Sequence, residues 1–212
     1  MYFVSFDFNN MLQTFNFSTD YILEDENVLL RPLTENDYEL LLPFALNEPD
    51  TWKFSLVPVV GATGLKNYIE TALTARNEEK EYPFIVFDKR QQKYAGCTRF
   101  YDIQLAKQSL QLGFTWYGKQ FRGTGLNKRC KFLLLELAFE KMQMERVEFR
   151  ADNNNKRSVA AMKSIGCTVE GVLRNHLPLP NGSRRDSIVL SILKDEWFGT
   201  VKTALANKIL AK

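Results

Sequence analysis

The sequence predicts a mixed α/β fold, in which a group of antiparallel strands is followed by alternating helices and strands. Two observations lead to this prediction. Strand-like runs bounded by polar turns lie in the middle of the chain, at 82–88, 94–101 and 109–116. After them, apolar residues recur at helical spacing over 125–142 and over 155–165. The 212 residues, 45% hydrophobic and 25% charged, suffice for one globular domain with a sizeable core.

The first half of the chain is predicted to form one strand, two helices and then a meander of three strands. A short strand is expected at 28–33, and Thr34 then supplies an N-cap ahead of an acidic first helical turn. The apolar stripe of a second, half-buried helix covers 65–79. Polar turns at 89–93 and 103–108 separate the three middle strands, which predicts an antiparallel meander.

The second half alternates between strands and helices. The expected elements, in order, are a helix at 125–142, a strand at 146–151, a helix at 155–165 ended by Gly166, and two strands at 168–175 and 186–193 around a turn at 180–182. There is no internal repeat and no Pro/Gly/Ser-rich linker. We therefore expect one domain over 21–197, with an N-terminal extension at 1–20 and a C-terminal helix at 198–212.

Composition excludes several classes of function. A net charge of +3, spread along the chain, does not indicate a nucleic acid or a membrane as the partner. The three cysteines are far apart and His176 is the only histidine, so the sequence lacks the usual zinc patterns and we expect no metal. Residues 1–18 lack the basic segment and cleavage site of an export signal, and Met11 is an alternative start. We expect a cytoplasmic protein.

The chemistry concentrates in the loop that joins the third middle strand to the next helix. Gly123 and Gly125 allow a tight turn and a close approach of the backbone to a ligand. The helix that begins there offers free N–H groups and a positive dipole end, which together bind phosphate. Leu126-Asn127 and Lys128 exclude the Walker and dinucleotide patterns. A plain glycine-rich turn is the alternative.

Two spaced motifs resemble those of a known family. Gln120-x-x-Gly123-x-Gly125 resembles the pyrophosphate loop of the GCN5-related (GNAT) N-acetyltransferases, and Asn155-x-x-Ser158 resembles their second signature. The likeness covers about 24–197 and is closest to the RimJ/RimL-like branch, the ribosomal-protein N-terminal acetyltransferases. The resemblance implies a central mixed, mostly antiparallel sheet of about seven strands with four or five helices. It also implies that the fourth and fifth strands splay apart around the cofactor.

The resemblance also implies acetyl-coenzyme A as co-substrate and a set of residues that bind it. Gln120 would brace the loop, and Asn155 would bond the pantetheine amides or act only as a helix N-cap. The residues expected along the cofactor are Phe114, Thr115 and Trp116 on the fourth strand, the backbone of Arg122, Gly123, Thr124, Gly125 and Leu126, and the side chains of Arg122 or Lys128.

The catalytic residues are harder to place. Many family members protonate the leaving thiolate with a tyrosine, but Met162 occupies that position, so Ser158 is the substitute, unless it is only a capping group. A backbone N–H near Phe114 or Thr115 would stabilise the oxyanion. His176 is the candidate base, with a surface histidine as the alternative. Glu148 is the carboxylate alternative, unless it pairs with a neighbouring cation.

Further charged and aromatic residues have two interpretations each. Lys128, Arg129 and Lys131 form a basic patch that either meets the 3′-phosphate of the coenzyme or is a solvated surface. Arg184-Arg185-Asp186 either steers an acidic peptide or fixes the hairpin, and Trp52 and Phe54 either line the acceptor mouth or pack in the core.

We therefore expect acetyl transfer from acetyl-CoA to a primary amine, by direct attack in a ternary complex. A protein or peptide N-terminus is the favoured acceptor, and small amines or antibiotics are the alternatives. A non-catalytic CoA-binding regulatory module is the competing class, because Met162 replaces the usual acid. The chain is expected to be a monomer or homodimer.

Overall fold

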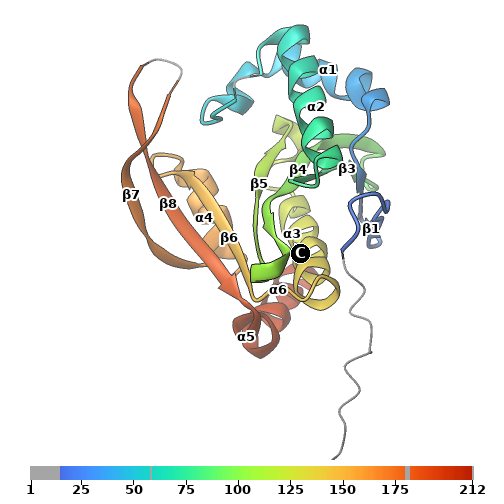
Figure 1. The fold of residues 1–212 in the computed structure, drawn as a ribbon. Coiled ribbons are helices and arrows are strands. Elements are labelled where there is room, and N and C mark those ends of the chain that lie inside the picture. Colours follow the sequence, from blue (N-terminus) through green and yellow to red (C-terminus); the bar gives the residue numbers. More distant parts are fainter. Residues whose placement is uncertain (1–14, 58, 180–181, 212) are drawn as a thin grey trace, which may run out of the picture.

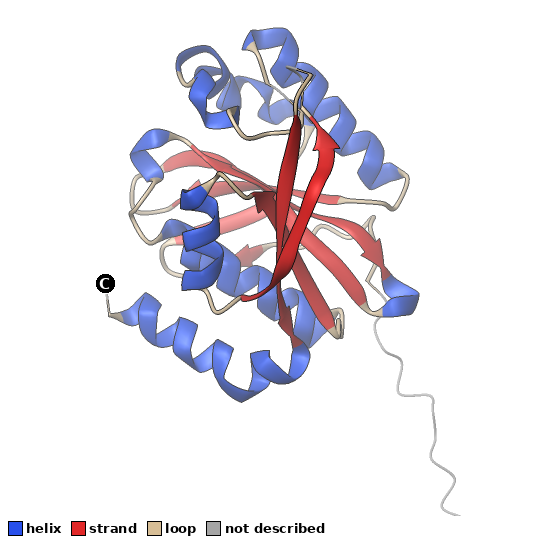
Figure 2. Ribbon diagram, turned by 90° about the vertical axis from the view of Figure 1, so that its left-hand side faces the viewer, coloured by secondary structure: helices blue, strands red, loops and turns tan. Residues whose placement is uncertain are grey.

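A computed structural model describes residues 15–57, 59–179 and 182–211. Its strands form one mixed sheet, and its helices cover both faces of that sheet (Figures 1 and 2). The strands are β1 (Leu23–Glu24), β2 (Val28–Pro32), β3 (Tyr82–Asp88), β4 (Lys93–Gln104), β5 (Ser109–Tyr117), β6 (Arg146–Asp152), β7 (Thr168–Pro178) and β8 (Arg184–Leu193). The α-helices are α1 (Tyr38–Asn47), α2 (Gly61–Asn77), α3 (Leu126–Glu136), α4 (Lys156–Ser164), α5 (Lys194–Glu196) and α6 (Lys202–Leu210).

The sheet runs in the order β1-β2-β3-β4-β5-β6-β8-β7, and β5 with β6 is its parallel pair. This pair is short. β5 and β6 are in register only from Ser109 to Gln111 and from Arg146 to Glu148, and beyond these three positions the two strands separate. Figure 1 shows the resulting gap, with β6, β8 and β7 on one side and β5 to β1 on the other. The predicted splay is therefore present.

Burial on both faces explains why the strands form a central sheet. Tyr82, Phe84, Ile85 and Val86 of β3 are all fully buried, because α2 packs on this strand on one face and further core lies on the other. On the far side of the gap, Val147 and Phe149 of β6 join the same core. One continuous core thus supports both halves of the splayed sheet.

Several boundaries differ from those that local patterns predict. β4 continues to Gln104 and β7 to Pro178, because each pairs with a neighbouring strand beyond its apolar run. The helix predicted to reach residue 142 changes to a π-helical turn at Leu137–Lys141. The structure has one strand that the sequence did not predict, the two-residue β1. Of the predicted turn at 180–182, positions 180 and 181 lie outside the described residues, as do Met11 and the rest of 1–14.

Candidate active site

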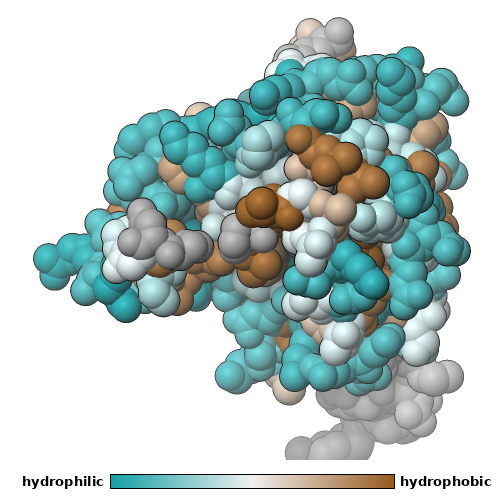
Figure 3. All heavy atoms as spheres, turned by 90° about the horizontal axis from the view of Figure 1, so that it is seen from above, coloured by the Kyte–Doolittle hydropathy of each residue, from teal (hydrophilic) through white to brown (hydrophobic). Residues whose placement is uncertain are grey.

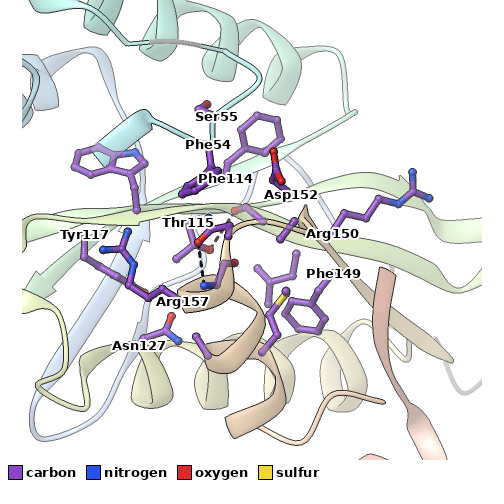
Figure 4. Close-up of a pocket in the computed structure, with 18 of the residues that line it drawn as sticks. Phe54, Ser55, Phe114, Thr115, Tyr117, Asn127, Phe149, Arg150, Asp152 and Arg157 are labelled. Carbon is purple, nitrogen blue, oxygen red and sulfur yellow. Dashed lines mark hydrogen bonds between the residues drawn. The ribbon is translucent and has the colours of Figure 1, made fainter. Parts of the chain in front are cut away.

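A cavity of about 560 Å³ lies where β5 and β6 separate (Figure 4). Its walls come from β5 and β6, from the N-terminal half of α3, from one side of α4, from the β7–β8 hairpin and from the connection between α1 and α2. Of the residues predicted to bind the cofactor or to act in catalysis, the cavity is lined by Phe114, Thr115, Trp116, Arg122, Gly123, Gly125, Lys128, Asn155, Ser158 and His176. The cavity therefore brings together residues that are far apart in the sequence.

The β5 wall carries a β-bulge. Arg99 and Cys97 of β4 pair with Gly113 and Trp116, so two residues of β5 face one residue of β4. Phe114, the first of these two, has a left-handed φ of 49°. The Arg99 guanidinium lies 4.2 Å from the Phe114 ring centroid, and the Tyr101 ring packs edge-on against it. Such bulges redirect backbone groups beside active sites, and this one lies where the oxyanion donor is expected.

The predicted phosphate loop ends at the N-terminus of α3. Gly123 and Gly125 have φ of 76° and 89°, which L-residues rarely adopt. Among the described residues, the amides of Gly123, Thr124, Gly125 and Asn127 donate to no acceptor, whereas the Arg122 amide donates to the Lys119 carbonyl at 3.2 Å. The backbone amides that remain free to bind an anion are therefore those of Gly123, Thr124, Gly125 and Asn127. The prediction had named the amides of 122–126 instead. Such a group of free amides at a helix start suits an anion.

The side chains around this loop divide into those that hold it and those that face the cavity. Arg122 donates from Nε to the Tyr117 carbonyl at 2.9 Å and from Nη2 to Thr51 Oγ1 at 2.8 Å. Thr124 Oγ1 donates to the Phe121 carbonyl at 2.8 Å. Burial lowers the pKa of Arg122, and the charge of Arg157, a cavity residue that the sequence did not indicate, lowers it further. The loop is thus braced by Arg122 and Thr124 and surrounded by positive charge.

Three predicted cofactor residues, Gln120, Thr124 and Leu126, do not line the cavity. Gln120 is exposed and makes no hydrogen bond to the described residues, so it does not brace the loop. Leu126 is fully buried in the core. The bracing expected of Gln120 comes instead from Arg122 and Thr124, whose side chains reach backbone carbonyls next to the turn.

At the start of α4, Asn155 acts as the N-cap. Its Oδ1 accepts a hydrogen bond from the Ser158 amide at 3.1 Å, and its side chain also lines the cavity. The Ser158 hydroxyl is half-buried and makes no hydrogen bond to the described residues. One turn later, Met162 is 8% exposed and presents a thioether, which has no proton to donate.

Lys131 is the cavity residue that sequence patterns placed wrongly. It was expected in a basic patch that either meets the 3′-phosphate of the coenzyme or is solvated, but it is 4% exposed and lies beneath the gap between β5 and β6. Its Nζ donates to Thr115 Oγ1 at 2.7 Å and to Thr98 Oγ1 at 3.2 Å, with the Phe149 ring centroid 6.0 Å away. Burial lowers the pKa of Lys131 to about 8. Arg129 is not a free cation of this patch either, because its Nη1 forms an ion pair with Asp25 Oδ2 at 2.8 Å.

His176 reaches the opposite end of the cavity from β7. Its Nδ1 lies 2.9 Å from Ser187 Oγ, which leaves Nε2 for another partner. Partial burial lowers the pKa of His176, and the guanidinium groups of Arg150, Arg185 and Arg184 lower it further. The lowered pKa favours the neutral imidazole, which is the form that acts as a general base.

Glu148, the alternative base, does not line the cavity. Its carboxylate lies between Arg146 Nη2 at 2.7 Å and Arg150 Nε at 2.6 Å. A carboxylate that already accepts two charge-assisted hydrogen bonds is a poor proton acceptor. The structure thus favours the ion-pair interpretation of this residue.

The connection between α1 and α2 covers the cavity from above. Trp52 is 6% exposed and packs on Trp116, with ring centroids 4.9 Å apart, whereas Phe54 and Ser55 line the upper side of the cavity (Figure 4). Viewed from above, hydrophobic side chains are exposed as a group at this end of the molecule (Figure 3). The exposed apolar residues of the connection are Leu56, Val57 and Val60.

Comparison with known proteins gives the family. The GNAT acetyltransferase domain matches residues 27–168, about two thirds of the chain. The chain belongs to the GNAT acetyltransferase family. Its eight-stranded mixed sheet with the splay at β5 and β6 is the GNAT fold, and this GNAT protein is an N-acetyltransferase.

Three relatives illustrate the likeness. A solved structure from T. thermophilus, described as a "putative acetyltransferase", is 33% identical over 88% of this chain and 96% of that one, with a TM-score of 0.78. The "Putative ribosomal N-acetyltransferase YdaF" of Bacillus subtilis is 31% identical, but the match spans only 49% of this chain and 56% of YdaF. The structure of Microcin C7 self immunity acetyltransferase MccE with acetyl-CoA and AMP, 23% identical, covers 80% of this chain and 93% of that one, with a TM-score of 0.71.

Two features are absent from the described residues, a metal-binding cluster and a membrane-spanning helix. In 15–57, 59–179 and 182–211, no group of three or more His, Cys, Asp or Glu side chains could hold a metal ion. Within the same ranges, no helix is both long and apolar enough to span a bilayer.

Proposed function

We propose that this GNAT protein moves an acetyl group from acetyl-CoA to a primary amine, with a protein or peptide N-terminus as the acceptor. The observation that supports this most directly is the cavity itself. It has free backbone amides at the α3 end, suited to a diphosphate, and at the β7 end an imidazole whose lowered pKa favours the neutral form, suited to take a proton from an amine.

Acetyl-CoA fits the residues at the α3 end. Its diphosphate would accept hydrogen bonds from the amides of Gly123, Thr124, Gly125 and Asn127, with Lys128 and Arg157 adding positive charge. Its pantetheine arm would lie along β5 in the gap, where β6 no longer supplies a neighbouring strand. The acetyl-CoA complex of MccE, which shares the fold, supports this choice of co-substrate.

The chain's own groups can then carry out the transfer. His176 would take the proton of the amine, whose nitrogen attacks the thioester carbon, and an N–H at the Phe114 bulge would stabilise the oxyanion. As the C–S bond breaks, the Ser158 hydroxyl, which lines the cavity, would donate a proton to the sulfur; Ser158 would then regain a proton from solvent as His176 releases one. The products are the acetylated amine and free CoA.

Direct attack is favoured over a cysteine-bound acetyl group. All three cysteines are buried, and burial raises the pKa of Cys130 and of Cys167 to about 12 and that of Cys97 well above its ordinary value. A thiol that stays protonated is a poor nucleophile. The amine therefore attacks acetyl-CoA without an enzyme-bound intermediate.

The test is release of CoA thiol by the purified protein across N-terminal peptides, free amino acids, polyamines and aminoglycosides. We expect saturable release with peptides, and loss of both release and acetyl-CoA binding in Gly123→Glu, where a side chain and a negative charge enter the phosphate loop. His176→Gln should retain binding but lose most turnover. Binding of acetyl-CoA without release from any acceptor would contradict the proposal.

A further inference from the structure

Arg185 of β8 is a buried cation that forms no ion pair with the described residues. It is 7% exposed, and its Nε donates to Ser187 Oγ at 2.9 Å. Its two terminal nitrogens make no hydrogen bond to the described residues, and no carboxylate of these residues lies within the 4.0 Å of an ion pair. Burial lowers the pKa of Arg185, although Asp152 opposes this effect. The guanidinium lines the cavity, so its free N–H groups face the space where an acceptor would enter.

The neighbouring charges are already engaged. Arg150, the other cation on this wall, donates to Glu148 at 2.6 Å. Asp152 accepts a hydrogen bond from the Asn154 amide through Oδ1 at 2.8 Å. Of the charged side chains on this part of the wall within the described ranges, Arg185 and Asp152 form no ion pair, and Arg185 is the cation of the two. Burying a cation in this way costs free energy, which an anionic ligand would offset.

Arg185 also lies away from the proposed diphosphate site. Ile188 and Leu190 of β8 belong to the hydrophobic core, so by strand alternation Arg185 and Ser187 point to the other face of the sheet. His176 Nδ1 and Arg185 Nε both approach the same Ser187 hydroxyl, each at 2.9 Å. The free guanidinium is therefore beside the proposed base, where the acceptor amine would react.

We propose that Arg185 is the anion-binding subsite of the acceptor pocket, and that the acceptor carries a carboxylate close to its reacting amine. This inference rests on the proposed function and names its substrate class. The planar fork of arginine pairs with a carboxylate through two parallel hydrogen bonds, a geometry that a neutral acceptor cannot supply. The carboxylate belongs either to the acidic side chain of an N-terminal Asp or Glu or to a free α-amino acid.

Matched acceptors distinguish these two sources. Thiol release is measured at saturating acetyl-CoA with a peptide that begins with Glu against the same amidated peptide beginning with Gln, and with alanine against alaninamide. A charge-assisted pair of about 1.5–3 kcal/mol predicts a kcat/KM ratio of about 10 to 150 in favour of the carboxylate within one of these pairs. A ratio near one in both pairs would overturn the inference.

Variants assign the preference to the residue. In Arg185→Met the ratio should fall to near one, mainly through a higher KM for the carboxylate acceptor, and Arg185→Lys should keep part of it. Arg174→Met, which removes the same charge from an exposed position on β7, should keep the full ratio. If Arg185→Met retains the preference, another group binds the carboxylate and Arg185 has only a structural role.

A binding measurement keeps this test separate from that of the proposed function. Calorimetric titration of the same peptide and amino-acid pairs into the CoA-loaded protein needs no turnover. Tighter binding of the carboxylate member, lost in Arg185→Met but not in Arg174→Met, would support the inference even if no acceptor were acetylated. Equal binding of both members of each pair by the wild-type protein would refute it.

Discussion

Lys131 shows how a single side chain can link stability to pH. The amine is buried, is bonded only to two threonine hydroxyls among the described residues, and has its pKa lowered to about 8 from the 10.5 of an exposed lysine. Below pH 8 both the folded and the unfolded chain hold this proton, so the cost of burying the charge is present in full. Between pH 8 and 10.5 the unfolded chain holds more protons than the folded one, so stability rises with pH.

We predict that Lys131→Met removes this rise. In the wild-type protein, the lowered pKa of Lys131 should raise the free energy of unfolding by about 3 kcal/mol between pH 8 and 10.5. Urea unfolding at several pH values from about 7.5 to 10 would measure this rise. Lys107→Met, at an exposed position, serves as the control because it should follow the wild-type curve. If the Lys131→Met and wild-type curves run parallel, the lysine is not titrating as proposed.

The placement of Lys131 also shows where sequence patterns stop being informative. Lys128, Arg129 and Lys131 form one basic run, and nothing in the run distinguishes the third cation from the first. The difference comes from Thr98 and Thr115, which lie on separate strands and meet the amine only in the folded sheet. Arg185 is similar, because its lack of a partner depends on where β6 and β8 place the neighbouring carboxylates. By contrast, the tight turn at Gly123 and Gly125 is set by local sequence, and the glycine pattern predicted it.

At the scale of elements, the start of α4 combines two roles that can be separated. The Asn155 side chain caps the helix through the Ser158 amide and also faces the cavity. Asn155→Ala should lower the free energy of unfolding by about 1 kcal/mol and weaken acetyl-CoA binding. Asn155→Ser keeps a capping oxygen but loses the amide, so it should restore stability without restoring affinity. Chemical denaturation and calorimetry measure the two effects, and recovery of both in the serine variant would leave Asn155 as a cap alone.

The elements themselves followed from the sequence to different degrees. β3 was predicted with its observed bounds because its apolar run and its hydrogen-bonded length coincide. β7 and β8 extend further than predicted, since Leu177 pairs with Arg185 and Pro178 with Arg184 although neither arginine belongs to an apolar run. Pairing between distant segments sets those ends, and a local pattern cannot encode it.

At the scale of the whole molecule, the gap between β5 and β6 predicts where acetyl-CoA should change the dynamics. The three paired positions of each strand are hydrogen-bonded in the protein alone, whereas 112–117 and 149–152 lack that partner across the gap. Hydrogen exchange with and without acetyl-CoA should therefore show added protection at 112–117 of β5, and little change at Ser109–Gln111. Protection that increased equally along the strand would contradict a cofactor lying against β5.

The two halves of the sheet are joined at the short paired segment of β5 and β6, so a small tilt between them produces a displacement that grows with distance from this segment. At about 3.3 Å per residue, a side chain about six positions from the paired segment lies about 20 Å out along the strand. Tilting one half-sheet by about 3° would then displace that cavity wall by about 1 Å, a misalignment that can cost a large part of a catalytic rate. Substitutions at Ser109, Leu110 and Arg146–Glu148, which do not line the cavity, would thus tune the alignment of donor and acceptor more strongly than their position suggests.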